Sequence, residues 1–384
     1  MTTHDSADAY EVAVIGAGLA GAATAWELAR RGVSTVLVEA YRPGHRQGSS
    51  HGSSQIFARS SADPFYVELS GQAEACWQEL EADAGTRLRQ TTGALDFGTR
   101  RAPARLAALL AAAGVRHELL PAGAAAERWP QLRFDEGPVL YHPEAGRLDP
   151  DATVAACVNR AVAHGAQLRT GVRVSGVERP ANRRLRLRGP GLDRAPVHAE
   201  QVVVAAGAWL PELGLDARLP PLTVTQHQVF HFRRREPGPG WPVFVHRGGP
   251  QVYGMPSGAD GGAEGFLGSY RLGLLDDGRV TTASTRSGVV DPASRHAVGE
   301  YVRARMPGFD PVPFAESSSL RTSTPSGDFV LDRSGPLVVV SPCSGHGGRF
   351  APLIGRLTAD LVLGKAGAPA RFALPASGAS QRLR

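Results

Sequence analysis

The sequence predicts an α/β fold of two domains, one built on a parallel sheet and one on an antiparallel sheet, which is an α+β arrangement for the whole chain. Three observations predict it. A glycine-rich loop joins an apolar strand to a helix at the start of the chain, and a later buried strand again ends in glycine. Within residues 86–146 and 223–324, short segments rich in β-branched and aromatic residues are bounded by turn residues, as is typical of strands.

The first of these features is the stretch YEVAVIGAGLAGAATAWELARRGVSTVLVEA, residues 10–40, which predicts a strand, a tight turn, a helix and a second strand. Gly16 permits the turn, Gly18 lets the backbone approach a diphosphate, and Gly21 lets the helix pack closely on the strand. The helix N-terminus offers N–H groups and a positive dipole end to the phosphates. Glu39 ends the second strand, where its carboxylate accepts hydrogen bonds from ribose hydroxyls and disfavours a 2′-phosphate. A Rossmann-like domain that binds FAD or NAD is therefore predicted.

Two later glycine loops favour FAD over NAD. The buried strand at residues 202–206 ends at Gly207, where the backbone again passes close to a cofactor. The stretch SGHGGRF, residues 344–350, precedes an expected helix at 350–363. FAD needs such a loop because its flavin lies far from its adenine, and N–H groups aimed at the flavin stabilise the negative charge of its reduced form. The first and last loops are therefore expected to hold the diphosphate and the flavin.

Several motifs, in this order along the chain, resemble one flavoprotein superfamily. They are the first fingerprint, GSSHGSSQIFARS (48–60), GRLDP (146–150), VVVAAGAW (202–209), YGMPS (253–257) and SGHGGRF. Together they look like the D-amino-acid-oxidase type, and within it like glycine oxidase, monomeric sarcosine oxidase and N-methyltryptophan oxidase. The resemblance runs nearly end to end.

This resemblance implies the domain organisation. A discontinuous FAD-binding domain is expected at residues 8–85, 147–222 and 325–384. The two insertions, 86–146 and 223–324, would build an antiparallel-sheet substrate-binding domain over the flavin.

The motifs and the resemblance together imply the residues that contact FAD. The expected set is Gly16, Gly18, Leu19, Ala20, Gly21, Glu39, Ala40, Ser49, Ser50, His51, Gly52, Val174, Ala206, Gly207, Trp209, Arg321, Gly345, His346, Gly347, Gly348 and Arg349. For His346, a packing role and a direct flavin contact both stay open. Sarcosine-oxidase relatives bond the flavin covalently to a cysteine near the place of Ser319, and none of Cys76, Cys157 and Cys343 falls near it. We therefore expect non-covalent FAD.

Five residues are candidates for the substrate side of the site: Arg321, Arg349, His51, Tyr253 and Tyr270. Arg321 matches the arginine that clamps the substrate carboxylate in glycine oxidase, and Arg349 stands where sarcosine-oxidase relatives have a substrate-binding lysine. A carboxylate buried beside the flavin needs a charge partner. The alternatives are a surface arginine for Arg321, a solvated helix residue for Arg349, and core or wall positions for the two tyrosines.

The sequence also departs from these relatives. Their arginines at the places of Gln55 and Ala58 are missing, and Phe266 stands where they have a lysine that promotes O2 reduction. The only lysine of the chain, Lys365, lies past the last expected helix. If O2 is the electron acceptor, His51, Arg349 or the iminium product is expected to stabilise superoxide. Otherwise the electrons pass to another acceptor.

The implied reaction is oxidation of a C–N bond in an amino acid or secondary amine. Two separate arginines favour an N-substituted glycine, cleaved to glyoxylate and a primary amine with peroxide formation. The alternatives are a sarcosine, N-methyl or cyclic imino acid oxidase, a dehydrogenase that uses an acceptor other than O2, and a non-catalytic flavin-binding protein.

Composition limits the partners. The net charge of +6 comes from dispersed arginines without a recognition motif, so nucleic acid is not expected as a partner. Apolar runs are too short to span a membrane, and three widely spaced cysteines fit a reducing cytoplasm. The histidines and cysteines lack metal-site spacing, so no metal is expected. The expected partners are a small amine or amino acid and O2, with the protein a monomer or homodimer.

Overall fold

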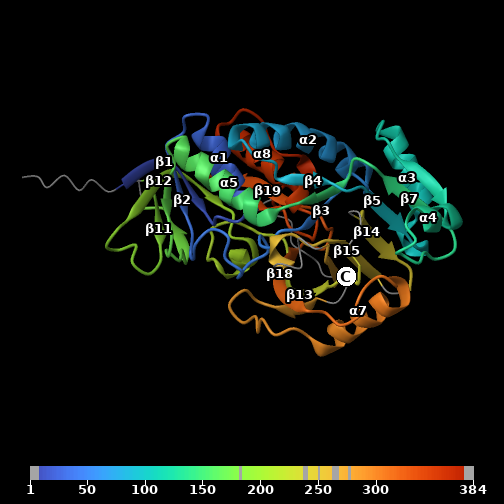
Figure 1. Ribbon diagram of the computed structural model, residues 1–384. Helices are drawn as coiled ribbons and strands as arrows, with labels where there is room; N and C mark the ends of the chain where they lie inside the picture. Colours follow the sequence, from blue (N-terminus) through green and yellow to red (C-terminus); the bar gives the residue numbers. More distant parts are fainter. Residues whose placement is uncertain are drawn as a thin grey trace, which may run out of the picture.

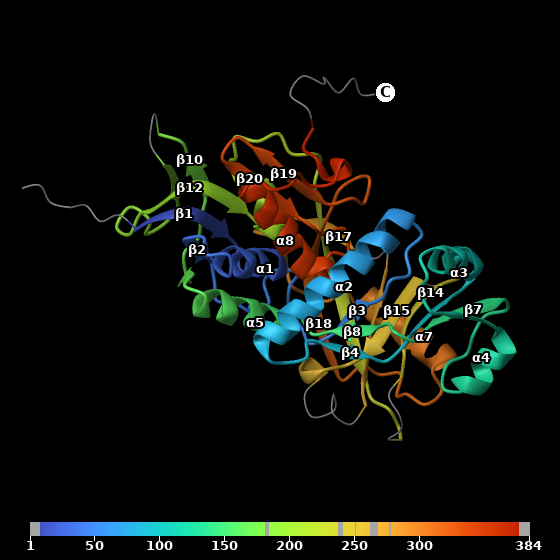
Figure 2. The ribbon, with the colours of Figure 1, turned by 90° about the horizontal axis from the view of Figure 1, so that it is seen from above.

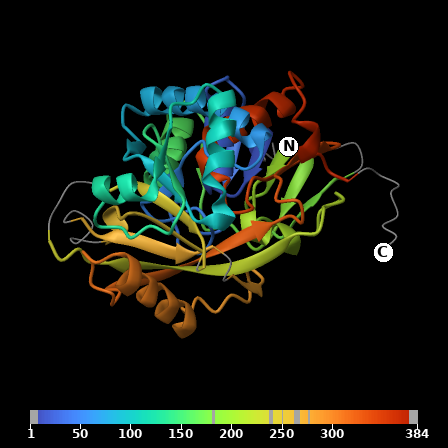
Figure 3. The ribbon, with the colours of Figure 1, turned by 90° about the vertical axis from the view of Figure 1, so that its right-hand side faces the viewer.

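The computed structural model describes residues 8–180, 184–236, 241–249, 251–261, 268–275 and 278–375. Figure 1 shows helices covering one sheet, with a second sheet below them and one helix on its far side. Figure 3 shows the second sheet, in yellow and orange, edge-on beneath the helical layer. The expected α/β fold with a parallel and an antiparallel region is confirmed.

The first sheet grows from the strand–helix–strand unit that the first glycine loop predicts. Its three elements are β1 (Asp8–Ile15), α1 (Leu19–Ala29) and β2 (Thr35–Val38). β1 pairs in parallel with β2 on one side and with β12 (Val197–Val204) on the other. The other strands of this sheet are β9 (Gln167–Arg169), β10 (Gly176–Glu178), β11 (Leu185–Arg188), β19 (Val330–Ser334) and β20 (Leu337–Ser341).

Both faces of this sheet are buried, which explains its nearly continuous apolar strands. Val12 and Val14 on β1 pack into the core beneath the helices, whereas Ala13 and Ile15 pack into a second core on the opposite face. The helices on the first face are α1, α2 (Pro64–Ala84), α5 (Pro150–Ala163) and α8 (Ala351–Val362). Figure 2 shows these helices from above, lying over the strands.

Strand β20 brings the end of the chain beside its beginning. β20 pairs in parallel with β12, so β12 lies between β1 and β20 at their carboxyl ends. The helix expected after the last glycine loop is α8, preceded by the short 3-10 helix η4 (Gly348–Phe350). The two loops that are expected to hold FAD therefore follow strands that flank the same strand.

Within the described residues, the second sheet has nine strands and is antiparallel except at one pair. It runs β17-β13-β16-β15-β14-β5-β7-β6, with β18 added beside β13. Its strands are β5 (Ala94–Phe97), β6 (Glu118–Pro121), β7 (Pro138–His142), β13 (Thr223–Phe232), β14 (Val243–Arg247), β15 (Gln251–Pro256), β16 (Tyr270–Leu274), β17 (Arg279–Thr281) and β18 (Ala315–Ser323). β5 and β14 pair in parallel, so the expected antiparallel sheet is mixed at this point.

The remaining elements are a small third sheet and the other helices. A three-stranded sheet contains β3 (Gln55–Phe57), β8 (Gly146–Leu148) and β4 (Arg89–Thr91). Helix α7 (Pro292–Arg305) covers the outer face of the second sheet, and Asp291 caps it by accepting a hydrogen bond from the Ala293 N–H at 3.2 Å. The other helices are α3 (Pro103–Ala112), α4 (Ala122–Arg128), η1 (Thr99–Arg101), η2 (Gly207–Glu212), η3 (Ala259–Gly261) and η5 (Ala370–Phe372).

The close packing of α1 on the first loop yields a stability prediction for Gly21→Ala. A Cβ on Gly21 would lie 1.8 Å from the backbone oxygen of Gly16, so the helix must shift away from the loop. We expect a loss of about 1–3 kcal/mol of unfolding free energy and weaker FAD retention. Thermal denaturation and the flavin content of the purified protein measure these effects.

Gly123→Ala is the matched control for this substitution. Gly123 is an exposed glycine in α4, and a Cβ there would meet no atom within 4 Å. Alanine should leave the unfolding free energy unchanged or raise it slightly. Equal stability and flavin content in the two variants would show that the packing of α1 on the loop is not tight.

Candidate cofactor and substrate site

A cavity of about 750 Å³ is lined by segments of both large sheets. It reaches from Glu39, after β2, to Arg349, at the start of the last helical segment. Most residues that the sequence assigns to FAD or substrate line it: Gly16, Gly18, Leu19, Ala20, Glu39, Ala40, Ser49, Ser50, His51, Val174, Ala206, Gly207, Trp209, Tyr253, Arg321, Gly345, His346, Gly347, Gly348 and Arg349. Gly21, Gly52 and Tyr270 are not among the lining residues.

The first glycine loop forms one end of the cavity. Gly16 has φ +96°, and a Cβ on it would lie 2.6 Å from the Ala205 carbonyl oxygen, so β1 and β12 leave no room for a side chain here. Gly18 is the N-cap of α1, and the Leu19 N–H donates to Ser50 Oγ at 3.1 Å. A backbone turn without side chains at a helix N-terminus fits the diphosphate of FAD.

Glu39 is held as a carboxylate at the same end of the cavity. It is 4% exposed, and it accepts hydrogen bonds from the N–H groups of Ala17 at 2.7 Å and Tyr41 at 2.9 Å. Burial alone would raise the pKa of Glu39, but the hydrogen bonds from His45 and these two N–H groups outweigh burial and lower it. An ionised acceptor at this place suits ribose hydroxyls.

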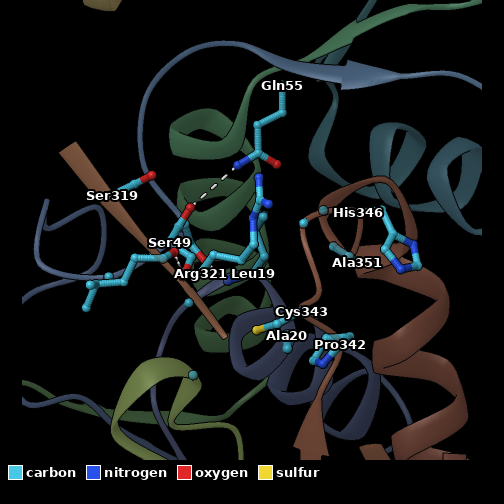
Figure 4. Close-up of a pocket in the computed structure, with 18 of the residues that line it drawn as sticks. Leu19, Ala20, Ser49, Gln55, Ser319, Arg321, Pro342, Cys343, His346 and Ala351 are labelled. Carbon is cyan, nitrogen blue, oxygen red and sulfur yellow. Dashed lines mark hydrogen bonds between the residues drawn. The ribbon is translucent and has the colours of Figure 1, made fainter. Parts of the chain in front are cut away.

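The last glycine loop forms the other end of the cavity (Figure 4). Ser344 has φ +52°, and a Cβ on Gly347 would lie 1.4 Å from the Pro342 carbonyl oxygen. The loop is tied to β18 because the Ser344 N–H donates to the Thr322 carbonyl at 2.7 Å. The loop thus exposes backbone where a flat ring can approach. A single cavity with one backbone cradle at each end fits an extended FAD.

His346 is part of this loop, and its side chain packs against neighbouring aromatic rings. Its Nε2 is 3.1 Å from the Gly327 carbonyl oxygen, and its ring stacks on Phe329 and meets Tyr66 edge-on at 4.6 Å. Burial, and then the positive charge of Arg349, lower the pKa of His346 to about 4. These contacts favour the packing role for its side chain.

His51 is also neutral at physiological pH. It is 5% exposed, and burial, followed by the charge of Arg271, lowers its pKa to about 4. A neutral imidazole carries no positive charge, so His51 cannot stabilise superoxide as a cation.

The two expected substrate arginines reach the cavity from different elements. Arg321, on β18, donates from Nη1 to the Leu275 carbonyl at 3.3 Å. Arg349, in η4, donates from Nη1 to the Ala58 carbonyl at 2.6 Å. Burial lowers the pKa of Arg349 to about 10, so it stays cationic at neutral pH. Both guanidinium groups bond to backbone carbonyls, so their charge remains available to a bound anion.

The second sheet supplies a wall of the cavity through alternate residues of its strands. Met255 on β15 stands opposite Arg271 on β16, and both line the cavity. Tyr270, the neighbour of Arg271, points to the opposite face, is 2% exposed, and donates from its hydroxyl to the Pro242 carbonyl in the hydrophobic core. The structure therefore places Tyr270 away from the substrate side, because successive residues of a strand face opposite sides.

Six charged residues that line the cavity were missed from the sequence. They are Asp96, Arg101, Arg173, Glu212, Arg247 and Arg271. Arg271 is 7% exposed; its Nη1 donates to the Ser54 carbonyl at 2.8 Å and lies 3.3 Å from Asp260 Oδ2. Successive residues of β16 face opposite sides of the sheet, so recognising Tyr270 as a core residue would have indicated that Arg271 faces the cavity. For the other five charged residues the sequence alone holds no such signal.

Gly52 and Gly21 serve packing around the cavity. Gly52 has φ +89°, and a Cβ there would lie 2.9 Å from Arg271 Nη1, so this glycine makes room for the buried arginine.

Ser319 and Cys343 both line the cavity, although they are far apart in sequence (Figure 4). Burial raises the pKa of the Cys343 thiol, which disfavours its nucleophilic thiolate form. Phe266 lies outside the described residues.

Among the described residues, no group of three or more histidine, cysteine or acidic side chains is placed to hold a metal ion. In the same part of the chain, no helix is both long and apolar enough to cross a bilayer.

Comparison with known proteins identifies relatives over nearly the whole chain. A model of the family described as FAD dependent oxidoreductase matches residues 11–361. A monomeric sarcosine oxidase of Streptomyces avermitilis is 30% identical over 378 residues, which cover 92% of this chain and 94% of that protein. The human peroxisomal sarcosine oxidase is 28% identical, with 93% of each chain covered.

Solved structures show the same similarity. The open form of NikD, described as an unusual amino acid oxidase essential for nikkomycin biosynthesis, superposes with a TM-score of 0.84 at 26% identity, covering 98% of this chain and 100% of that one. A glycine oxidase of Geobacillus kaustophilus superposes with a TM-score of 0.76 at 23% identity, covering 96% and 98%, and supports the fold.

The buried histidines yield a prediction about pH and stability. His51, His142, His231 and His346 all have pKa values lowered by burial from 6.5 to about 4. The unfolded chain therefore takes up protons that the native state does not, so stability falls as pH falls from 6.5 towards 4. Each histidine contributes on the order of 3 kcal/mol at most to this loss.

We expect His346→Gln to make the melting temperature less sensitive to pH across this range. Glutamine can still donate to the Gly327 carbonyl but does not titrate. His296→Gln, at an exposed position on α7, is the control and should leave the slope unchanged. Identical slopes for wild type and His346→Gln would contradict the assignment of His346 as a buried neutral group.

Proposed function

The chain belongs to the FAD-dependent oxidoreductase family, and from this premise we propose that it oxidises an N-substituted glycine to glyoxylate and a primary amine. Its homologues are FAD-dependent amine and amino-acid oxidases, and FAD is the cofactor of this chain. In the proposed reaction, the amine, O2 and water give glyoxylate, the primary amine and H2O2. The substrate loses two electrons and two protons to form an imine, which water then hydrolyses.

The observation that carries the proposal is the presence of Arg321 and Arg349 in one cavity with the last glycine loop. A glycine carboxylate bound by one of these arginines places its α-carbon beside the loop that would hold the flavin. A guanidinium offers two parallel donors to a carboxylate, which fixes orientation as well as position. Bound FAD supplies the hydride acceptor, so the residues of this chain bind the substrate, orient it and exclude water.

The protein residues that would hold FAD fall into two groups. The turn at Gly16 and Gly18 together with Glu39 would take the diphosphate and the ribose. The backbone of residues 344–349 would take the flavin and stabilise negative charge on its reduced form.

A second candidate is oxidation of an N-methyl group, as the names of the sarcosine oxidase relatives suggest. The same arginines would hold the same carboxylate, but the N-methyl carbon would face the flavin. With sarcosine as substrate, this reaction releases formaldehyde and glycine, whereas oxidation at the glycine carbon releases glyoxylate and methylamine. Product analysis with sarcosine and a longer N-alkylglycine therefore separates the two.

Substitution of Arg321 tests the proposed function. We expect Arg321→Ala to raise KM for an N-alkylglycine by about 30-fold or more, because a buried charge-assisted contact of about 2–3 kcal/mol is lost. Arg321→Lys should recover part of this loss. The control is Arg279→Ala, since the Arg279 side chain is 74% exposed on β17. An unchanged KM in Arg321→Ala, or no glyoxylate from any N-alkylglycine, would contradict the proposal.

We also expect FAD to be bound without a covalent link. Ser319 offers no thiolate, and burial keeps the Cys343 thiol protonated. Acid precipitation of the purified protein should leave the yellow flavin in the supernatant. A yellow pellet from the wild type, together with a colourless pellet from a Cys343→Ser variant, would show instead that Cys343 forms the link.

A further inference from the structure

Asp96 has a buried carboxylate oxygen without a partner in the wall of the cavity. The residue lies on β5, is 1% exposed, and lines the cavity. Its Oδ1 accepts a hydrogen bond from Arg101 Nε at 2.6 Å. Its Oδ2 is buried and has no hydrogen-bond partner within the described residues. Such an acceptor is costly to bury, so a group that donates to it is expected.

The strand register places Asp96 on the substrate side of the cavity. In the parallel pair of β5 and β14, Asp96 stands opposite Val245. Val245 in turn stands opposite Tyr253 on β15. All three residues line the cavity. Because residues opposite each other across a sheet point to the same face, the carboxylate belongs to the wall formed by the second sheet and not to the diphosphate end.

Arg349 supplies the complementary unpaired donor. Its Nε is buried and has no partner within the described residues. Arg349 Nη1 donates to the Ala58 carbonyl, and Ala58 packs in one cluster with Ala94, two residues before Asp96 on β5. The charges of Asp96 and Arg101 also act on the pKa of Arg349. The cavity therefore offers a cationic donor and an anionic acceptor near each other. A molecule that carries a carboxylate and an N–H group matches both.

We propose that Asp96 Oδ2 binds the substrate nitrogen by accepting a hydrogen bond from its N–H, while Arg349 binds the carboxylate together with Arg321. This inference rests on the proposed function, because it assigns the nitrogen end of the same substrate. A secondary amine has one N–H and one lone pair, so donation to Asp96 leaves the lone pair free to assist loss of hydride from the neighbouring carbon. Neutral tertiary amines have no N–H and are excluded from this contact.

Two inert ligands of the same shape test the contact without any turnover. Pyrrole-2-carboxylate and furan-2-carboxylate share a five-membered ring and a carboxylate, but the first has a ring N–H where the second has an oxygen. Titration of the FAD-loaded enzyme, followed by the flavin absorption spectrum and by calorimetry, gives both dissociation constants. We expect the wild type to bind the pyrrole about ten- to a hundredfold more tightly, as one hydrogen bond to a charged group allows.

Asp96→Asn should abolish or reverse this preference, since asparagine can accept from Arg101 while presenting its NH2 to the ligand. The control is Asp135→Asn. Asp135 pairs with Arg305 and His246 in the same part of the fold but does not line the cavity. It should keep the wild-type preference.

Equal affinities in the wild type, no binding of either ligand, or the same preference in wild type and Asp96→Asn would each overturn the inference. The wild-type measurement decides the matter even if Asp96→Asn fails to fold. A wild type that prefers the pyrrole and loses the preference in Asp96→Asn, yet releases no glyoxylate from N-alkylglycines, would refute the proposed function alone.

Discussion

The site depends on the position of one strand, β12, between β1 and β20. All three run in parallel, so their carboxyl ends meet at one edge of the sheet, with Ile15 opposite Val204 and Val204 opposite Val339. Loops that follow parallel strands form the binding crevice of such a sheet. Segments more than 300 residues apart in sequence thereby face a single cavity. The close backbone contact at Gly16 shows how little room the pairing leaves for side chains.

The charges of the cavity follow from what it has to hold. Its diphosphate end combines backbone groups with the ionised carboxylate of Glu39 and the neighbouring Arg173, whereas its other end contains several arginines. Burial of Arg349 without a carboxylate partner is unfavourable in the unliganded protein. A substrate carboxylate would offset this cost, so the cost itself contributes to selectivity for anionic amines. Asp96 limits the excess of positive charge and gives the cavity a buried carboxylate oxygen that has no partner within the described residues.

The sequence was sufficient for features that depend on local backbone geometry. The first loop, Glu39 and the glycines before α8 could be predicted because tight turns and helix N-termini require particular residues at fixed spacing. It was insufficient where the answer depends on which strands pair. Tyr270 and Arg271 are adjacent, and only the register of β16 decides which of them faces the cavity. Asp96 reaches the site through a parallel pairing of β5 with β14, about 150 residues away, which no local pattern indicates.

The central claim is that both loops hold the same cofactor molecule, and a crystal structure of the FAD-containing protein tests it most directly. Electron density should show an extended FAD, with its diphosphate at the N-terminus of α1 and its flavin ring against residues 344–349. A folded or displaced FAD whose flavin lies away from that loop would contradict the account, because the arginines would then have no reacting ring beside them.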